Sequence, residues 1–191
     1  RNASTWTPTV QTYNLTSNTW TKKVDIPFPV SFAAAVTGDD GKIYVLGGTE
    51  PNGAVNTDRL QIYDPETDTW TLGTSLPAPR TQLGAVKDRN GFVYAIGGQT
   101  LPATSGALNI VEVYDPYSET WSTRTPIPEG RNEFGATLGA DGNIYVIGGG
   151  HSYENNTPPF FGTVMVYDPL ANTWGFDANM PTPRKELGTV T

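Results

Sequence analysis

A tyrosine followed seven residues later by a tryptophan occurs four times in this chain, at Tyr13/Trp20, Tyr63/Trp70, Tyr114/Trp121 and Tyr167/Trp174. A Gly-Gly pair lies between successive copies, at 47/48, 97/98 and 148/149. Each of the first three tryptophans stands 28 residues before the second glycine of the next pair, but that glycine stands 15, then 16, then 18 residues before the next tyrosine. Stacked repeats must keep their packed segments in register. The constant spacing therefore marks a scaffold, and the variable spacing marks one loop per repeat as the candidate functional surface.

Alignment on the Gly-Gly pairs predicts four strands, A to D, in each repeat. Strand A is small and apolar, and we expect it at Ser31–Thr37, Thr81–Lys87, Glu133–Leu138 and Glu186–Val190. An Asp-Gly or Asn-Gly turn typical of a tight hairpin leads to strand B, expected at Lys42–Leu46, Phe92–Ile96 and Asn143–Ile147. Strand C, at Leu60–Tyr63, Val111–Tyr114 and Val164–Tyr167, leads through Asp-Pro to the Thr-Trp of strand D. Four such antiparallel strands, the innermost made of small residues, are what one β-propeller blade requires.

The repeated motifs together resemble the kelch repeat. They are R-x-[E/Q]-[L/F]-G, a D-G or N-G turn, [I/V]-Y-[V/A]-[L/I]-G-G, Y-D-P and T-W, in three full copies with a partial copy at each end. The first unit departs from the pattern, with Val30, Ser31 and Phe32 in place of Arg, any residue and Gln or Glu, and the first tail has Asn14-Leu15 in place of Asp-Pro. The resemblance implies an all-β fold, a kelch-like β-propeller of four-stranded antiparallel blades.

We expect a single propeller segment over residues 1–191, forming an incomplete ring of about three and a half blades. Strands C and D of a shared blade occupy 1–26, three blades occupy 27–76, 77–127 and 128–180, and 181–191 is the first strand of the next blade. Propellers have about 4–8 blades. Because open strand edges and apolar blade faces invite association, we expect the remaining blades to come from the same gene, from another chain or from self-association.

The periodic aromatic residues and glycines are interpreted as scaffold. A buried tyrosine or tryptophan ring covers about 150–250 Å², so the repeated rings are expected to pack between blades. The glycines are expected to provide positive φ angles or close backbone approach. These positions therefore predict the fold and not the ligand.

Composition excludes several classes of function. The formal net charge of −7 argues against nucleic acid as the main partner, because phosphate binding relies on clustered Lys and Arg. The chain has no cysteine and therefore no disulfide, thiolate metal site or cysteine nucleophile of its own. Its longest apolar run, Phe32 to Val36, is far shorter than the ~20 residues of a membrane helix, so we expect no membrane insertion. No calcium-loop, P-loop or nucleophile-elbow motif occurs, and we expect no cofactor and no metal.

Three arginines fill one repeat position, and an acid or amide follows each of them two residues later. These residues are Arg80, Arg131 and Arg184, with Gln82, Glu133 and Glu186. In a propeller this position lies at the channel mouth on the face of the B–C loops, so we expect the guanidinium groups to converge there. Because arginine binds carboxylates bidentately, the arrangement predicts recognition of an acidic group, as the kelch resemblance also implies. The alternative is that each arginine pairs with the neighbouring acid or with backbone carbonyls and joins adjacent blades.

The variable loops between strands B and C are the second candidate contact surface. They span Thr49–Arg59, Gln99–Asn109 and Gly150–Thr163. In the third loop, His151 and Tyr153 are candidate ligand contacts, whereas Phe160 and Phe161 are expected to pack. A single histidine in a loop does not indicate catalysis.

The sequence thus predicts a non-enzymatic binding module for a protein or carbohydrate ligand, including an acidic one, at the arginine-lined mouth and the B–C loops. The alternative is a carbohydrate-modifying enzyme. The kelch resemblance implies it, because kelch-like sialic acid mutarotases act through Arg and Glu at the mouth, and Glu133 and Arg131 would then be base and anchor. Three N-x-[S/T] sites, at Asn2, Asn14 and Asn155, favour an extracellular or cell-surface location over a cytoplasmic one and leave the compartment open.

Overall fold

The computed structural model describes residues 6–51, 55–101, 106–151 and 160–189. Within these ranges the chain forms fourteen strands and no helix, so no helix in the described part is long and apolar enough to span a membrane. The strands make three four-stranded antiparallel sheets and one two-stranded hairpin. The all-β prediction is therefore confirmed.

The three sheets are consecutive along the chain. The first contains β3 (Ala34–Thr37), β4 (Ile43–Leu46), β5 (Leu60–Asp64) and β6 (Thr69–Leu72). The second contains β7 (Gly84–Lys87), β8 (Val93–Ile96), β9 (Val111–Asp115) and β10 (Thr120–Arg124). The third contains β11 (Gly135–Leu138), β12 (Ile144–Ile147), β13 (Val164–Asp168) and β14 (Thr173–Asp177). The hairpin β1 (Val10–Asn14) and β2 (Thr19–Lys23) precedes them.

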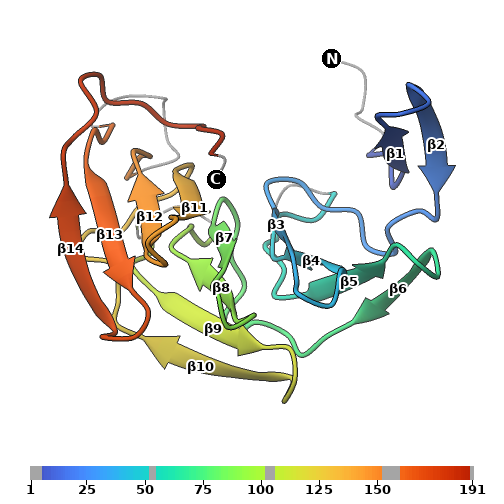
Figure 1. Cartoon of the computed structure of the whole chain (residues 1–191), viewed down its shortest axis with the longest axis horizontal. Helices are drawn as coiled ribbons and strands as arrows, with labels where there is room; N and C mark the ends of the chain where they lie inside the picture. The colour runs from blue at the N-terminus through green and yellow to red at the C-terminus, as the bar shows by residue number, and fades with distance from the viewer. Residues whose placement is uncertain (1–5, 52–54, 102–105, 152–159, 190–191) are drawn as a thin grey trace.

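The sheets are arranged as propeller blades in an open ring (Figure 1). Strands β3, β7 and β11 line the centre, and β6, β10 and β14 form the outer rim (Figure 1). The ring is open between the β1–β2 hairpin and the third blade, which gives about three and a half blades, as the sequence predicts.

Strand A is shorter than predicted, because each innermost strand begins two or three residues late. Ser31, Thr81 and Asn132 instead form isolated bridges to the residue that follows each Gly-Gly pair. The prediction of a fourth strand A at Glu186–Val190 is wrong over its described residues, 186–189, which form no strand. A strand needs a paired neighbour, and the chain described here provides no strand B beside this segment.

The Tyr and Trp of each repeat form a cross-strand pair within a blade and a hydrogen bond between blades. Tyr114 and Trp121 lie opposite each other in β9 and β10, with ring centroids 5.1 Å apart. The indole Nε1 of Trp121 donates to the carbonyl oxygen of Thr74 in the preceding blade at 2.9 Å. Trp70 and Trp174 make the equivalent bonds. The motif therefore joins neighbouring blades, as the packing interpretation expected.

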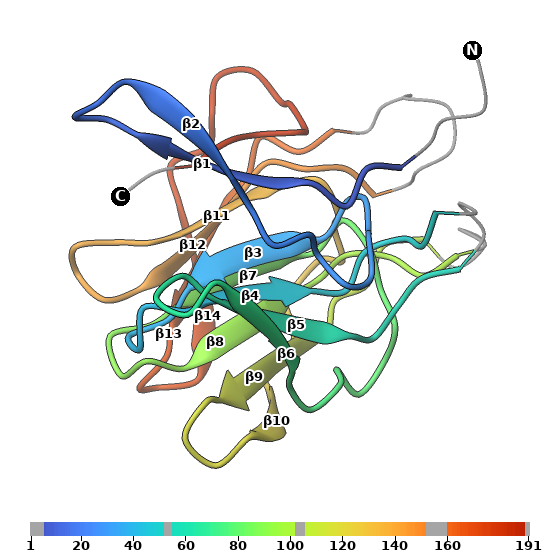
Figure 2. The same cartoon turned by 90° about the vertical axis from the view of Figure 1, so that its right-hand side faces the viewer.

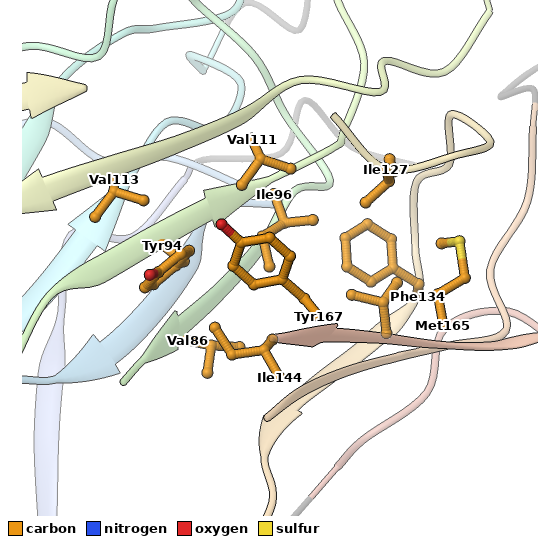
Figure 3. Close-up of a cluster of buried hydrophobic side chains, with 11 residues drawn as sticks. Val86, Tyr94, Ile96, Val111, Val113, Ile127, Phe134, Ile144, Met165 and Tyr167 are labelled. Carbon is orange, nitrogen blue, oxygen red and sulfur yellow. The ribbon is translucent and has the colours of Figure 1, made fainter. Parts of the chain in front are cut away.

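Two hydrophobic cores fill the spaces between successive blades. Figure 3 shows the cluster between the second and third blades, where Tyr94 of β8 and Tyr167 of β13 meet with ring centroids 5.8 Å apart. Tyr44 of β4 and Tyr114 of β9 make the matching contact between the first and second blades, at 6.2 Å. Burial of these apolar faces is the main stabilising contribution to a stacked fold.

The Gly-Gly pairs lie at the joints between blades. Gly97 and Gly98 have φ values of 55° and 91°, which are in the region that favours glycine. The N–H of Gly98 donates to the carbonyl oxygen of Arg131 in the next blade at 2.9 Å, and a Cβ added at Gly97 would lie 2.6 Å from the same oxygen. The first and third pairs make the same bond, to Arg80 and Arg184. Both the φ angle and the close approach therefore require glycine.

Gly97→Ala is predicted to lower the free energy of unfolding by about 3 kcal/mol or more, because strain at positive φ and a backbone clash add together. Gly41→Ala is the matched control. Gly41 also has a positive φ, of 76°, but a Cβ there meets nothing within 4 Å, so the expected loss is about 1–2 kcal/mol. Urea unfolding of both variants measures the difference, and equal losses would contradict a blade joint at Gly97.

Candidate functional site

The loops and turns divide between two faces of the ring. The A–B hairpin turns and the C–D turns lie on one face, because antiparallel strands return to the same end after each turn. The B–C loops and the D–A connections lie on the other, where the N-terminal segment also runs (Figure 2). We call this second side the loop face. The sequence-predicted site residues that the structure describes belong to it.

Four equivalent residues form a backbone ladder around the inner edge of the loop face. Gln82 donates its N–H to the carbonyl oxygen of Phe32 at 2.8 Å, Glu133 to that of Gln82 at 3.2 Å, and Glu186 to that of Glu133 at 2.7 Å. All four residues have positive φ angles, of 53° to 58°, which are costly for residues other than glycine. The bonds between blades hold this conformation. They also place the four side chains at equivalent positions around the channel.

Arg80 is fully buried. Its guanidinium forms an ion pair with Glu112 of β9, a side chain that is itself only 7% exposed. Burial lowers the pKa of Arg80, and the charge of Glu112 opposes that shift. Nε and Nη1 of Arg80 have no hydrogen-bond partner among the described residues. Arg80 therefore lies inside the second blade and joins its D–A connection to β9.

Arg131 is also fully buried, but it has a different set of partners. Its Nη1 donates to the carbonyl oxygen of Gly148 at 3.0 Å, and its guanidinium lies over the ring of Phe161 at 4.5 Å. The Glu129 carboxylate is 3.4 Å away and half exposed. Burial lowers the pKa of Arg131 to about 10, and Glu129 offsets only part of that effect. Phe161 packs, as expected, and does so against this arginine.

Arg80 and Arg131 are thus bonded to protein groups inside the propeller, as the alternative interpretation expects, but these groups belong to their own blades, and the acid that pairs with Arg80 is not its neighbour in sequence. Arg184 alone of the three is exposed. Glu186 is exposed as well, with a side chain that is 71% accessible. Ligand binding by any of these residues stays a prediction.

Glu133 and Gln82 belong to a polar network that the sequence reasoning did not identify. One oxygen of Glu133 accepts from Nε2 of Gln82 at 2.6 Å, and the other accepts from Nζ of Lys185 at 2.5 Å. Nδ2 of Asn132 donates to Oε1 of Gln82 at 3.3 Å and to Oε1 of Gln99 at 2.7 Å. The only signal in the sequence was position, since these residues directly neighbour the arginine and Gly-Gly motifs.

The third B–C loop is described only at its two ends. His151 is exposed, with Nδ1 3.3 Å from the carbonyl oxygen of Gly130, and its own carbonyl accepts from the N–H of Ala107 at 2.9 Å. Tyr153 lies outside the described residues. His151 therefore occupies the loop face and links the third loop to the second.

The opposite face of the ring also has a hollow, but this hollow gives no evidence of a ligand site. It has a volume of about 390 Å³ and is lined by turn residues of the second and third blades. Its acidic side chains already serve the turns: Asp141 accepts from the N–H of Asn143 at 3.1 Å, and Asp168 accepts from that of Leu170 at 2.8 Å. Over the described ranges no group of three or more His, Cys, Asp or Glu is arranged to hold a metal ion.

Comparisons with known proteins agree with this geometry. The family model of the KLHDC2/KLHL20/DRC7 Kelch-repeats domain matches residues 1–189. Kelch-like protein 35 of Mus musculus is 32% identical over 160 residues, which are 84% of this chain and 25% of that protein. Kelch-like protein terF of Aspergillus terreus is 29% identical over 184 residues, which are 94% of this chain and 29% of that protein.

Other matches are shorter in sequence or are structural. Kelch-like protein 23 of Mus musculus is 36% identical over 85 residues, which are 44% of this chain and 14% of that protein. The solved structure of YjhT matches with a TM-score of 0.78 and 16% identity, over 94% of this chain and 64% of that one. The chain therefore spans less than a third of the length of the curated relatives named here.

The buried ion pair gives a prediction that the chain's own repeats make testable. Glu112→Gln leaves the charge of Arg80 buried without a partner, and we expect it to lower the free energy of unfolding by about 3–5 kcal/mol. The double variant Arg80→Val/Glu112→Gln copies the first blade, which has Val30 and Gln61 at these positions. There Gln61 bonds the backbone N–H and carbonyl of Phe28, and Ala78 is the equivalent of Phe28 in the second blade.

We expect the double variant to recover at least half of that loss. Urea unfolding is the measurement. A tolerated single variant, or a double variant less stable than the single, would contradict a structural role for Arg80.

Proposed function

The chain belongs to the kelch-repeat family, and from that premise we propose that it is a binding module that recognises a protein partner through its loop face. The observation that carries the proposal is that the repeated residues are already engaged inside the protein. The indoles of three repeat tryptophans, the Gly-Gly pairs, Arg80 and Arg131 all make contacts within or between blades. What remains free to contact a partner is the set of side chains and loops that differ from blade to blade.

The geometry favours a protein ligand over an acidic sugar. Sugar chemistry through Glu133 and Arg131 requires both groups to face one bound molecule. The contacts of Arg131 are Gly148, Glu129 and Phe161, and those of Glu133 are Gln82 and Lys185. The two sets share no member. The exposed groups left on the loop face, among them His151 and Arg184, suit the polar rim of a protein interface.

We also propose that the open ends of the ring bind further kelch-type blades. Trp70, Trp121 and Trp174 each donate to a carbonyl of the preceding blade, but Trp20 is 67% exposed. The equivalent carbonyl at the other end of the chain belongs to Ala178, which is also exposed. One open edge of the ring therefore offers the indole donor of this hydrogen bond, and the other open edge offers its carbonyl acceptor.

The inner tyrosines repeat this complementarity. Tyr44 and Tyr94 of strands β4 and β8 are 3% and 2% exposed, because a strand C tyrosine of the next blade covers each of them. Tyr145 of β12 has no such neighbour in the described chain and is less buried. At the other end, Tyr13 is 42% exposed. A blade that supplied both missing neighbours would bury an aromatic contact at each end.

Loop-face binding is tested by selecting short random peptides for retention on the immobilised chain. Peptides retained by the unmodified protein are expected to bind about tenfold more weakly to a His151→Ala/Arg184→Ala variant. The matched control is Tyr117→Ser/Leu170→Ser, which alters two exposed turn residues on the opposite face. Loss of binding in the control alone would contradict the loop face, and catalysed anomeric exchange of acidic sugars would favour an enzyme.

Association through the open ends is tested by light scattering on the 191-residue chain. We expect a mass above that of the monomer at micromolar concentration, and less association for Trp20→Ala, because the exposed indole belongs to the joint. Tyr117→Ser is the control, since it removes an aromatic ring that is even more exposed, at 99%, and lies away from either edge. A stable, monodisperse monomer would rule the proposal out.

A further inference from the structure

A small pocket opens on the loop face at the junction of the first and second blades. Its volume is about 140 Å³, and its apolar wall consists of Trp6, Phe32 and Leu101. An apolar cavity of about 150 Å³ is large enough for a benzene ring. No charged side chain of the described residues lines the pocket. It therefore suits one uncharged ring and not a carboxylate or a phosphate.

This pocket exists because the first blade departs from the repeat pattern. Phe32 fills the ladder position that Gln82 and Glu133 fill in the next two blades. At the following junction the same position carries polar side chains, and there Glu133 accepts hydrogen bonds from Gln82 and from Lys185. The departure thus replaces a filled polar junction by an aromatic wall that is 56% exposed at Phe32.

Ser31 lines the pocket and is only half-buried, whereas among the buried polar side chains of the lining one donor has no partner in the described part of the chain. Thr49 donates its hydroxyl hydrogen to Thr81 at 3.1 Å, and Thr81 donates to the carbonyl oxygen of Phe32 at 3.3 Å. Both groups of the Gln82 amide are bonded. Gln99 is fully buried and lines the pocket, and its Nε2 has no partner among the described residues. Asn56 and Asn132 each have an unpartnered oxygen too, but neither residue lines the pocket.

The orientation of the Gln99 amide is determined by the charge of Glu133, although two other amide side chains lie between them in the hydrogen-bond network. The carboxylate of Glu133 only accepts, so it requires the NH₂ group of Gln82 to face it. The oxygen of Gln82 then requires the NH₂ group of Asn132, and the second hydrogen of that group requires the oxygen of Gln99. The NH₂ group of Gln99 is left as the unbonded end. Glu133 is thus a positioning residue for a donor that it does not touch.

We propose that this pocket takes the side chain of a tyrosine from the protein partner, with Gln99 donating a hydrogen bond to the phenol oxygen. The inference rests on the proposed function. A phenol supplies one ring and one polar atom, which matches an apolar wall with one free buried donor. A pyranose brings several hydroxyl groups, and the buried polar groups of the pocket are otherwise occupied. Tyrosine is therefore favoured over phenylalanine and over a sugar.

The test uses p-cresol and toluene, the side-chain analogues of tyrosine and phenylalanine, titrated into the ¹⁵N-labelled chain. We expect both to shift the Trp6 indole signal, and only p-cresol to shift the Gln99 side-chain amide. We expect p-cresol to bind about fivefold more tightly, as one net hydrogen bond allows. Gln99→Met should abolish that preference while leaving toluene binding intact. Glu133→Gln, which permits either orientation of the Gln82 amide, should reduce the preference.

Tyr117→Ser is the control and should change neither titration. Equal affinity for p-cresol and toluene, or no shift of Gln99, would overturn the role of the donor. Stronger shifts with methyl glucoside would overturn the assignment to tyrosine in favour of a sugar. The second arm replaces each tyrosine of a retained peptide by phenylalanine and by alanine. Peptide retention without p-cresol binding would overturn the pocket alone, and p-cresol binding without any retained peptide would overturn the proposed function alone.

Discussion

The joint between blades depends on one repeated hydrogen bond, from the second glycine of each Gly-Gly pair to the carbonyl oxygen at the arginine position of the next blade. At 2.9 Å in all three copies, it connects the end of strand B to the following D–A connection. The first glycine of each pair lies so close to the same oxygen that a Cβ added there would be 2.4–2.6 Å from it, and both glycines have positive φ angles. The aromatic and apolar faces on either side of the joint then have a defined register in which to pack.

The same joint explains how the loop face can vary while the ring stays constant. The backbone ladder from Phe32 through Gln82 to Glu133 uses only main-chain atoms, so it makes no demand on the side chains that project beside the channel. An aromatic ring, an amide and an acid can therefore occupy equivalent positions. The positive φ angles cost free energy, but Gln82 and Glu133 are each held by ladder bonds on both sides, and Phe32 is held by one to Gln82. Each of these residues thus holds the ring together through its main chain and leaves its side chain free to vary.

Sequence spacing predicted the blades well, because constant distances and Asp-Gly or Asp-Pro turns report local pairing directly. It failed over 186–189, the described part of the strand A predicted at Glu186–Val190, where the local pattern of strand A is present but the described chain provides no strand B to pair with it. The site was less predictable. Side-chain burial depends on what faces a residue from another strand, and the pairing of Arg80 with Glu112, 32 positions away, has no signal in one sequence. The amide network of Asn132 and Gln99 is hidden for the same reason.

The space beneath the D–A connection is filled by different side chains in each of the three blades. These differences indicate the structural role of the arginine position. The second blade pairs Arg80 with Glu112, and the first has Val30 with Gln61, whose amide bonds the backbone of Phe28. The third has Met165 in place of the acid, and Arg131 bonds the carbonyl of Gly148 and stacks on Phe161 instead. A position that fills the space beneath a D–A connection need only be large, or be matched by its neighbour, and that is the pattern in these three blades.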